Sequence, residues 1–97
     1  MINELQKNII INTILPFHPV QIGIFGSVAR NENTENSDID IYYQLKDAVG
    51  LLNLVRIKDS LEEKLNKKVD LISERGIHPK LKPYIMNDLK IIYSNER

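Results

Sequence analysis

Three aspartates in short apolar segments are the residues of this sequence best suited to chemistry. Asp38 and Asp40 are separated only by Ile39, and Asp70 lies in the later segment Val69–Ile72. Side chains alternate along a strand, so Asp38 and Asp40 would project from one face, about 7 Å apart. Neighbouring carboxylates repel and raise each other's pKa, and a hard cation such as Mg²⁺ relieves that conflict. The pattern predicts a carboxylate metal site, which Asp70 joins if its strand lies beside that of Asp40.

Three converging carboxylates would also suit a two-metal site, in which the ions stand about 3.5–4 Å apart. One carboxylate, Asp70, could in addition accept the proton of an attacking hydroxyl as a general base. The sequence contains no cysteine, so a cysteine nucleophile is excluded and any metal here is held by oxygen ligands.

A glycine–serine pair, Gly26 and Ser27, ends an apolar segment and is separated from Asp38 by ten residues. Glycine lets a ligand approach the backbone closely, and free N–H groups at a helix start attract an anion such as phosphate. The serine hydroxyl adds a further donor. Such pairs occur in many ordinary turns, and the Gly-Lys-Ser/Thr of a P-loop is absent. Gly26 and Ser27 therefore predict phosphate binding only in combination with the carboxylates.

The elements that must position these residues follow from hydrophobic periodicity and turn residues. Asp47 is the predicted N-cap of a long helix that ends near Leu65. We expect an α/β (α+β) fold: a mixed sheet of about four strands with helices packed against one face, formed by residues 1–97 as a single domain. The predicted order is helix 2–15, strand 20–25, polar loop 30–37, strand 38–43, the long helix, strand 69–72, helix 81–89 and strand 90–93.

Composition excludes several classes of function. Thirteen basic residues balance 13 acidic ones, which argues against extended nucleic-acid binding through a broad basic surface. The absence of cysteine excludes disulfides and thiolate metal sites, and it fits a reducing, cytoplasmic location. No apolar run approaches the ~18 residues of a membrane helix, so no membrane association is expected.

The set Gly26-Ser27, then Asp38-Ile39-Asp40, then a strand aspartate at Asp70 resembles the nucleotidyltransferase superfamily of DNA polymerase beta. The small size is similar to that of the minimal nucleotidyltransferases, which are antitoxin partners of HEPN-domain toxins. One departure is Asn31, where many relatives carry glycine after the arginine; it touches no carboxylate. The resemblance covers nearly the whole chain and implies the nucleotidyltransferase fold.

The resemblance also implies an activity: Mg²⁺-dependent transfer of AMP from ATP to a tyrosine hydroxyl of a partner HEPN RNase toxin, which silences the toxin within a hetero-oligomer. Arg30 would lie near the phosphates or brace the loop. The implied nucleotide-binding residues are Gly26, Ser27 and Arg30. The implied metal-binding and catalytic residues are Asp38, Asp40 and Asp70.

Other interpretations of the same residues stay open at this point. Asp38 and Asp40 could be ordinary exposed carboxylates at a strand end, Arg30 a surface ion pair and Tyr42 a tyrosine at the edge of the core. The protein could also be a non-catalytic antitoxin that neutralises its toxin by binding alone. A nucleotidyltransferase with a small-molecule or RNA acceptor is a further alternative, which the lack of a basic groove disfavours.

Overall fold

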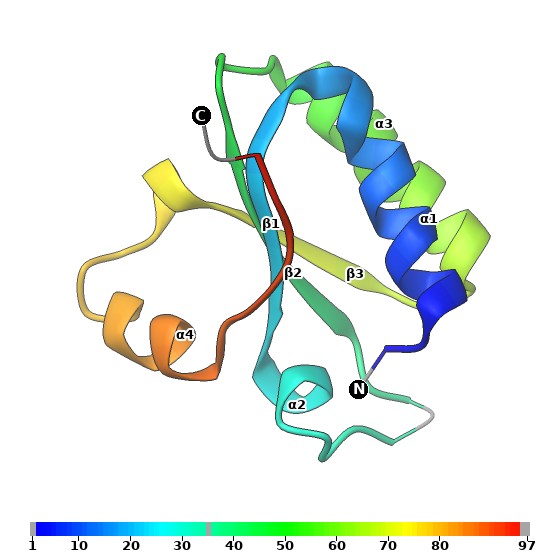
Figure 1. Cartoon of the computed structure of the whole chain (residues 1–97), viewed down its shortest axis with the longest axis vertical. Helices are drawn as coiled ribbons and strands as arrows, with labels where there is room; N and C mark the ends of the chain where they lie inside the picture. Colours follow the sequence, from blue (N-terminus) through cyan, green and yellow to red (C-terminus); the bar gives the residue numbers. More distant parts are fainter. Residues whose placement is uncertain (1, 35, 96–97) are drawn as a thin grey trace.

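A four-stranded mixed sheet forms the centre of the computed structural model, which describes residues 2–34 and 36–95 (Figure 1). The strands lie in the order β3–β2–β1–β4. β1 is antiparallel to both of its neighbours, whereas β2 and β3 are parallel. The predicted mixed sheet is therefore confirmed. The strands are β1 (Pro19–Phe25), β2 (Ile39–Leu45), β3 (Val69–Ser73) and β4 (Lys90–Ser94).

Two helices, α1 (Glu4–Ile14) and α3 (Leu51–Leu65), pack side by side against one face of the sheet (Figure 1). α1 begins with a capping box, in which the Asn3 side chain accepts from the Gln6 N–H and the Gln6 side chain accepts from the Asn3 N–H. Between these helices and the sheet lies the main core. Its fully buried side chains are Ile10, Ile14, Ile22, Ile24, Ile39, Ile41, Leu61 and Val69.

The opposite face of the sheet carries a smaller hydrophobic cluster beneath α4 (Lys82–Asp88). Phe25 and Tyr42 project there because side chains alternate along β1 and β2, and Ile85 of α4 covers them. The prediction of helices against one face holds for α1 and α3, and α4 adds partial cover to the other face. By the same alternation, Asp40 and Asp70 project from the face that α4 covers only in part.

The long helix α3 begins later than predicted, so the expected N-cap at Asp47 is wrong. The N-cap is Gly50, which has extended backbone and offers no side-chain cap. β2 continues to Leu45, beyond the predicted end at Tyr43, and the next five residues carry the chain from the sheet to the helix layer. Val49 packs against the core along this segment, and residues 46–50 form a bend and irregular chain rather than a helical turn.

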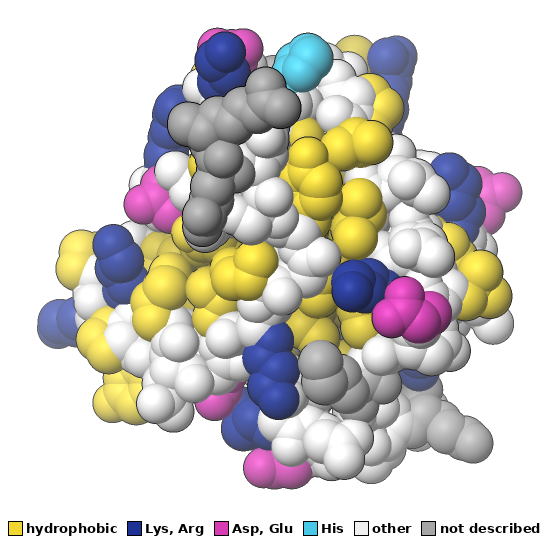
Figure 2. All heavy atoms as spheres, in the orientation of Figure 1, with side chains coloured by type: hydrophobic (Ala, Val, Ile, Leu, Met, Phe, Trp, Pro, Cys, Tyr) yellow, Lys and Arg dark blue, Asp and Glu magenta, His cyan; other side chains and the backbone are white. Residues whose placement is uncertain are grey.

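Several large hydrophobic side chains are exposed on the surface of the protein. Hydrophobic side chains are exposed over α4 and β4 in Figure 2, and they include Leu81, Tyr84 and Ile91. None of the helices within residues 2–34 and 36–95 is both long and apolar enough to cross a lipid bilayer.

Candidate active site

Asp40 and Asp70 lie side by side on neighbouring strands. Parallel pairing of β2 with β3 places Asp40 directly opposite Asp70 in the register. The start of β3 is fixed on both sides: the Ile39 N–H donates to the Lys68 carbonyl oxygen at 3.0 Å, and the Val69 N–H donates to Glu62 Oε2 at 2.9 Å. Two carboxylates are thus held together on one face of the sheet by the backbone ladder itself.

Asp38 stands just before β2 rather than inside it, and its side chain is exposed. Its negative charge nevertheless acts on Asp40. Partial burial, the charge and hydrogen bond of Asp70 and the charge of Asp38 together raise the pKa of Asp40 to about 6, while Arg30 opposes the shift. The carboxylates therefore form a site of concentrated negative charge.

Gly26 follows β1 directly and packs against the Asp40 side chain. Its φ of 72° lies in the left-handed region, and a Cβ at this position would come within 3.0 Å of Asp40 Oδ2. Only glycine meets both conditions without strain. The sequence therefore needs glycine here to bring the α2 backbone into contact with the carboxylate face.

The short helix α2 (Gly26–Ala29) presents Ser27 at its first turn. Val28 and Ala29 are buried in the main core and anchor the helix, while Ser27 is half-buried. Within the described chain the Ser27 hydroxyl makes no hydrogen bond, whereas the Ser27 carbonyl accepts from the Glu32 N–H at 2.9 Å. This hydroxyl is therefore available to a ligand at the end of β1.

Arg30 closes α2 and turns toward α4. Its Nη1 donates to Asp88 Oδ2 at the end of α4, and its Nε lies 3.4 Å from Glu32 Oε2. These contacts brace α2 against α4, and the charge of Arg30 also acts to lower the pKa of Asp40. Nucleotide binding by Arg30 stays a prediction. Asn31 follows with φ 59°, and asparagine tolerates this left-handed conformation best after glycine. Asparagine is therefore compatible with the backbone conformation of the loop at this position.

The donor set fits Mg²⁺ in chemistry, though not as a ready-made cage. Among residues 2–34 and 36–95, no three Asp, Glu, His or Cys side chains are already arranged to hold a metal ion. Mg²⁺ in phosphoryl-transfer sites is bound by one or two carboxylates together with substrate phosphates and water. The adjacent Asp40 and Asp70 supply such a pair; partial burial and then the charge of Asp70 raise the pKa of Asp40. The roles of Asp38, Asp40 and Asp70 as ligands stay a prediction.

We expect the Asp40 carboxylate to make the metal-free protein less stable as the pH rises from about 4 to 6. Its pKa is about 6 in the folded protein and 3.8 in the reference state, so the folded state holds the proton more tightly. Its contribution to stability is full below pH 3.8 and is lost as the pH rises through about 6. Urea unfolding in a chelator at several pH values measures this, with Asp40→Asn as the comparison. Parallel pH profiles for the two proteins would contradict the assignment.

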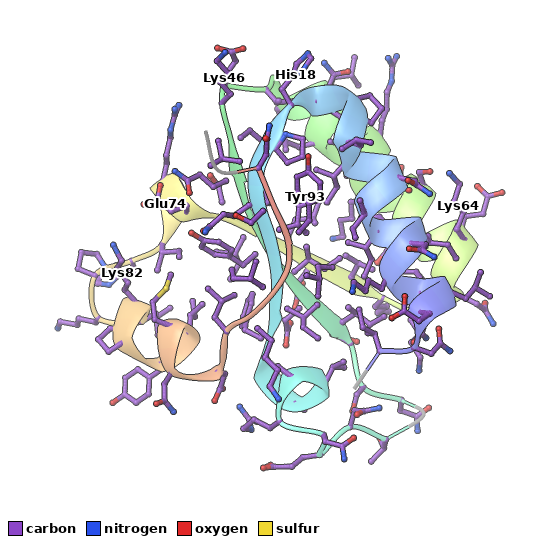
Figure 3. All side chains as sticks on the ribbon, viewed as in Figure 1. His18, Lys46, Lys64, Glu74, Lys82 and Tyr93 are labelled. Atoms are coloured by element: carbon purple, nitrogen blue, oxygen red, sulfur yellow. The ribbon has the colours of Figure 1, made fainter. Side chains whose placement is uncertain are left out.

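Two hollows of the surface lie away from the carboxylates. One is lined by His18, Lys46 and Tyr93 at the end of the sheet opposite α2 (Figure 3). Another is lined in part by Tyr43 and Glu74, also beyond the far end of β2 and β3. Asp38 and Asp70 are exposed, so the candidate site is open to solvent, which suits a ligand that itself supplies part of the metal coordination.

Sequence reasoning missed two residues that support the site. Asp88 holds Arg30, and Glu62 caps the start of β3. Each of them contacts a partner that no local sequence pattern links to it. Tyr42 was placed correctly as a core residue, since its ring is buried between Phe25 and Ile85.

Comparison with known proteins finds a matching family, relatives that are similar in sequence and solved structures that are similar in fold. Residues 4–97 match the family described as Polymerase beta, Nucleotidyltransferase. A candidate protein adenylyltransferase of Methanocaldococcus jannaschii is 49% identical over 88 residues, which are 90% of this chain and 92% of that protein.

Two solved structures are similar in fold. A chain of a toxin–antitoxin complex with AMP-PNP superposes with a TM-score of 0.83 at 24% identity, covering 93% of this chain and 74% of that one. A chain from a tri-AMPylated Shewanella oneidensis HEPN toxin in complex with MNT antitoxin gives 0.77 at 22% identity, covering 95% and 72%. At these identities the similarity shows a shared fold.

Proposed function

Because this chain belongs to the polymerase beta nucleotidyltransferase family, we propose that it is a protein adenylyltransferase that modifies a partner HEPN RNase toxin and so acts as its antitoxin. The observation that carries the proposal is the pairing of Asp40 with Asp70 on one sheet face, with the Gly26 backbone packed against it. ATP as the nucleotide and Mg²⁺ as the metal are part of this proposal. The name of the M. jannaschii relative and the AMP-PNP and AMPylated-toxin complexes support it.

The chemistry is transfer of an adenylyl group. The oxygen of an acceptor tyrosine forms a bond to the α-phosphorus of ATP, the bond from that phosphorus to the β-phosphate bridging oxygen breaks, and pyrophosphate leaves. Asp70 accepts the hydroxyl proton as general base. Bound Mg²⁺ would neutralise phosphate charge and orient the leaving group. Asp38, Asp40 and Asp70 would hold the metal, while the Ser27 hydroxyl and the α2 backbone N–H groups would bind the triphosphate.

The position of Asp70 favours an acceptor carried by another protein. β3 is an edge strand of the described sheet, and the Asp70 side chain is exposed. A hydroxyl on a partner's surface can therefore approach this carboxylate from beside the sheet. The exposed apolar side chains of α4 and β4 offer further area for assembly with that partner, as a hetero-oligomer.

The direct test uses the purified chain, its partner toxin, Mg²⁺ and ATP labelled at either the α- or the γ-phosphate. We expect the partner to gain label from α-labelled ATP and none from γ-labelled ATP, with release of labelled pyrophosphate in the second case. A tyrosine-to-phenylalanine variant of the acceptor is the control and should lose the label. Label from the γ-position, or equal labelling of the control variant, would overturn the proposal.

A further inference from the structure

The ion pair between Arg30 and Asp88 joins two parts of the candidate site that are far apart in the sequence. Arg30 is the C-cap of α2, and Asp88 is the last residue of α4. The Asp88 side chain is only 18% exposed, whereas that of Glu32, the other partner of Arg30, is 63% exposed. The Asp88 contact is therefore the less solvent-screened of the two and the stronger constraint on the guanidinium.

Arg30 belongs to the same helical turn as the phosphate-binding groups. Its N–H donates to the Gly26 carbonyl oxygen at 3.1 Å, and Gly26 packs against Asp40. An arginine side chain has several rotatable bonds, and holding it in one conformation costs side-chain entropy. The contact with Asp88 immobilises it before any ligand arrives, and Nη2 remains with two N–H donors that neither carboxylate uses.

We propose that Asp88 is a positioning residue, which holds the Arg30 guanidinium beside Gly26 and Ser27 so that its remaining donors bind the triphosphate of the nucleotide. The inference rests on the proposed function, because it takes a nucleoside triphosphate as the ligand. It assigns to α4 a part in nucleotide binding, although no residue of α4 belongs to the sequence motif.

Two other roles of Asp88 predict different effects on nucleotide binding, and the test distinguishes them. If Asp88 instead withdrew Arg30 from the phosphates, or only repelled them, Asp88→Asn would tighten nucleotide binding. If Asp88 only secured α4 on the sheet, its replacement would lower the melting temperature and would weaken binding whether or not Arg30 were present.

The experiment is a double-mutant cycle on the affinity for ATP with Mg²⁺, measured by calorimetry without any acceptor protein. We expect Asp88→Asn to weaken binding about 10-fold, as loss of a supporting partner does at other charged sites. Arg30→Ala should weaken it at least as much, and adding Asp88→Asn to Arg30→Ala should cause no further loss. The matched control is Glu32→Gln, which we expect to change the affinity less than twofold.

Tighter or unchanged binding by Asp88→Asn, or an undiminished effect of that substitution in the Arg30→Ala background, would overturn the proposal. A charge-swapped protein, Arg30→Asp with Asp88→Arg, adds an independent readout. It should recover the melting temperature of the wild type but not its nucleotide affinity, and recovery of both would also overturn the proposal.

The same measurements separate this inference from the proposed function. Wild-type protein that binds ATP but never labels its partner contradicts only the adenylyl transfer. Equal affinities across the cycle contradict only the role of Asp88. Failure of the wild type to bind ATP with Mg²⁺ would overturn both.

Discussion

Replacing Asp38 and Asp40 together with asparagine is expected to lower AMP transfer to the partner by at least about 10³-fold, or ~4 kcal/mol of transition-state stabilisation. Asparagine keeps the shape of each side chain but removes the negative charge that a divalent cation requires. The rate of label transfer from α-labelled ATP at saturating Mg²⁺ and partner measures the effect. Residual transfer within tenfold of the wild type would contradict a metal-binding role for this pair.

Folding and binding controls give this result its meaning. Asparagine at position 40 removes the charge whose partial burial and repulsion by Asp70 and Asp38 raise the pKa of Asp40 to about 6, so the metal-free variant should melt at a higher temperature than the wild type at neutral pH. The variant should also still assemble with the toxin. If the variant protects cells as well as the wild type does, the toxin is neutralised by binding alone, and the hypothesis of a catalytic antitoxin is wrong.

Gly26→Ala is expected to lower both stability and transfer, because no L-residue fits this position without strain. The left-handed φ of 72° costs roughly 1–2 kcal/mol for a residue with a Cβ, and that Cβ also pushes the Asp40 carboxylate away from its present position. We expect AMP transfer to fall about 100-fold, since small displacements of catalytic groups have effects of this size. Urea unfolding and single-turnover labelling measure the two losses.

Gly50→Ala is the matched control for this substitution. Gly50 has φ −65°, and no heavy atom lies within 4 Å of an added Cβ. Its replacement should leave transfer unchanged and alter the unfolding free energy by less than about 0.5 kcal/mol. Similar behaviour of the two alanine variants would show that the close approach of Gly26 to Asp40 is unimportant.

The alternation of side chains around Asp40 could be predicted from the sequence because it is a local property. Ile39 and Ile41 enter the main core, and Asp40 projects from the other face, as the period of a strand requires. The position of Asp70 needed more than periodicity, since only the parallel pairing of β3 with β2 sets it opposite Asp40. Local pattern thus identified the carboxylates, and strand order brought two of them together.

Contacts between segments that are distant in the sequence could not be predicted from local patterns. Asp88 meets Arg30 across 58 positions of the sequence, and an aspartate at the end of a short helix is in itself unremarkable. The prediction of where α3 begins was wrong for a related reason. Asp47 is a good N-cap by residue type, but the length of β2 and the burial of Val49 decide where the helix begins. Tertiary packing overrides local preference at both places.

The order in which the strands pair has a consequence for synthesis of the chain. β1 lies inside the sheet, yet one of its two neighbours is β4, the last strand along the sequence. All residues of the proposed catalytic face, Asp88 included, leave the ribosome before β4 does. Until residues 90–94 emerge, the nascent protein presents the unpaired edge of β1, an interval in which chaperones or a second unfinished chain have access to it.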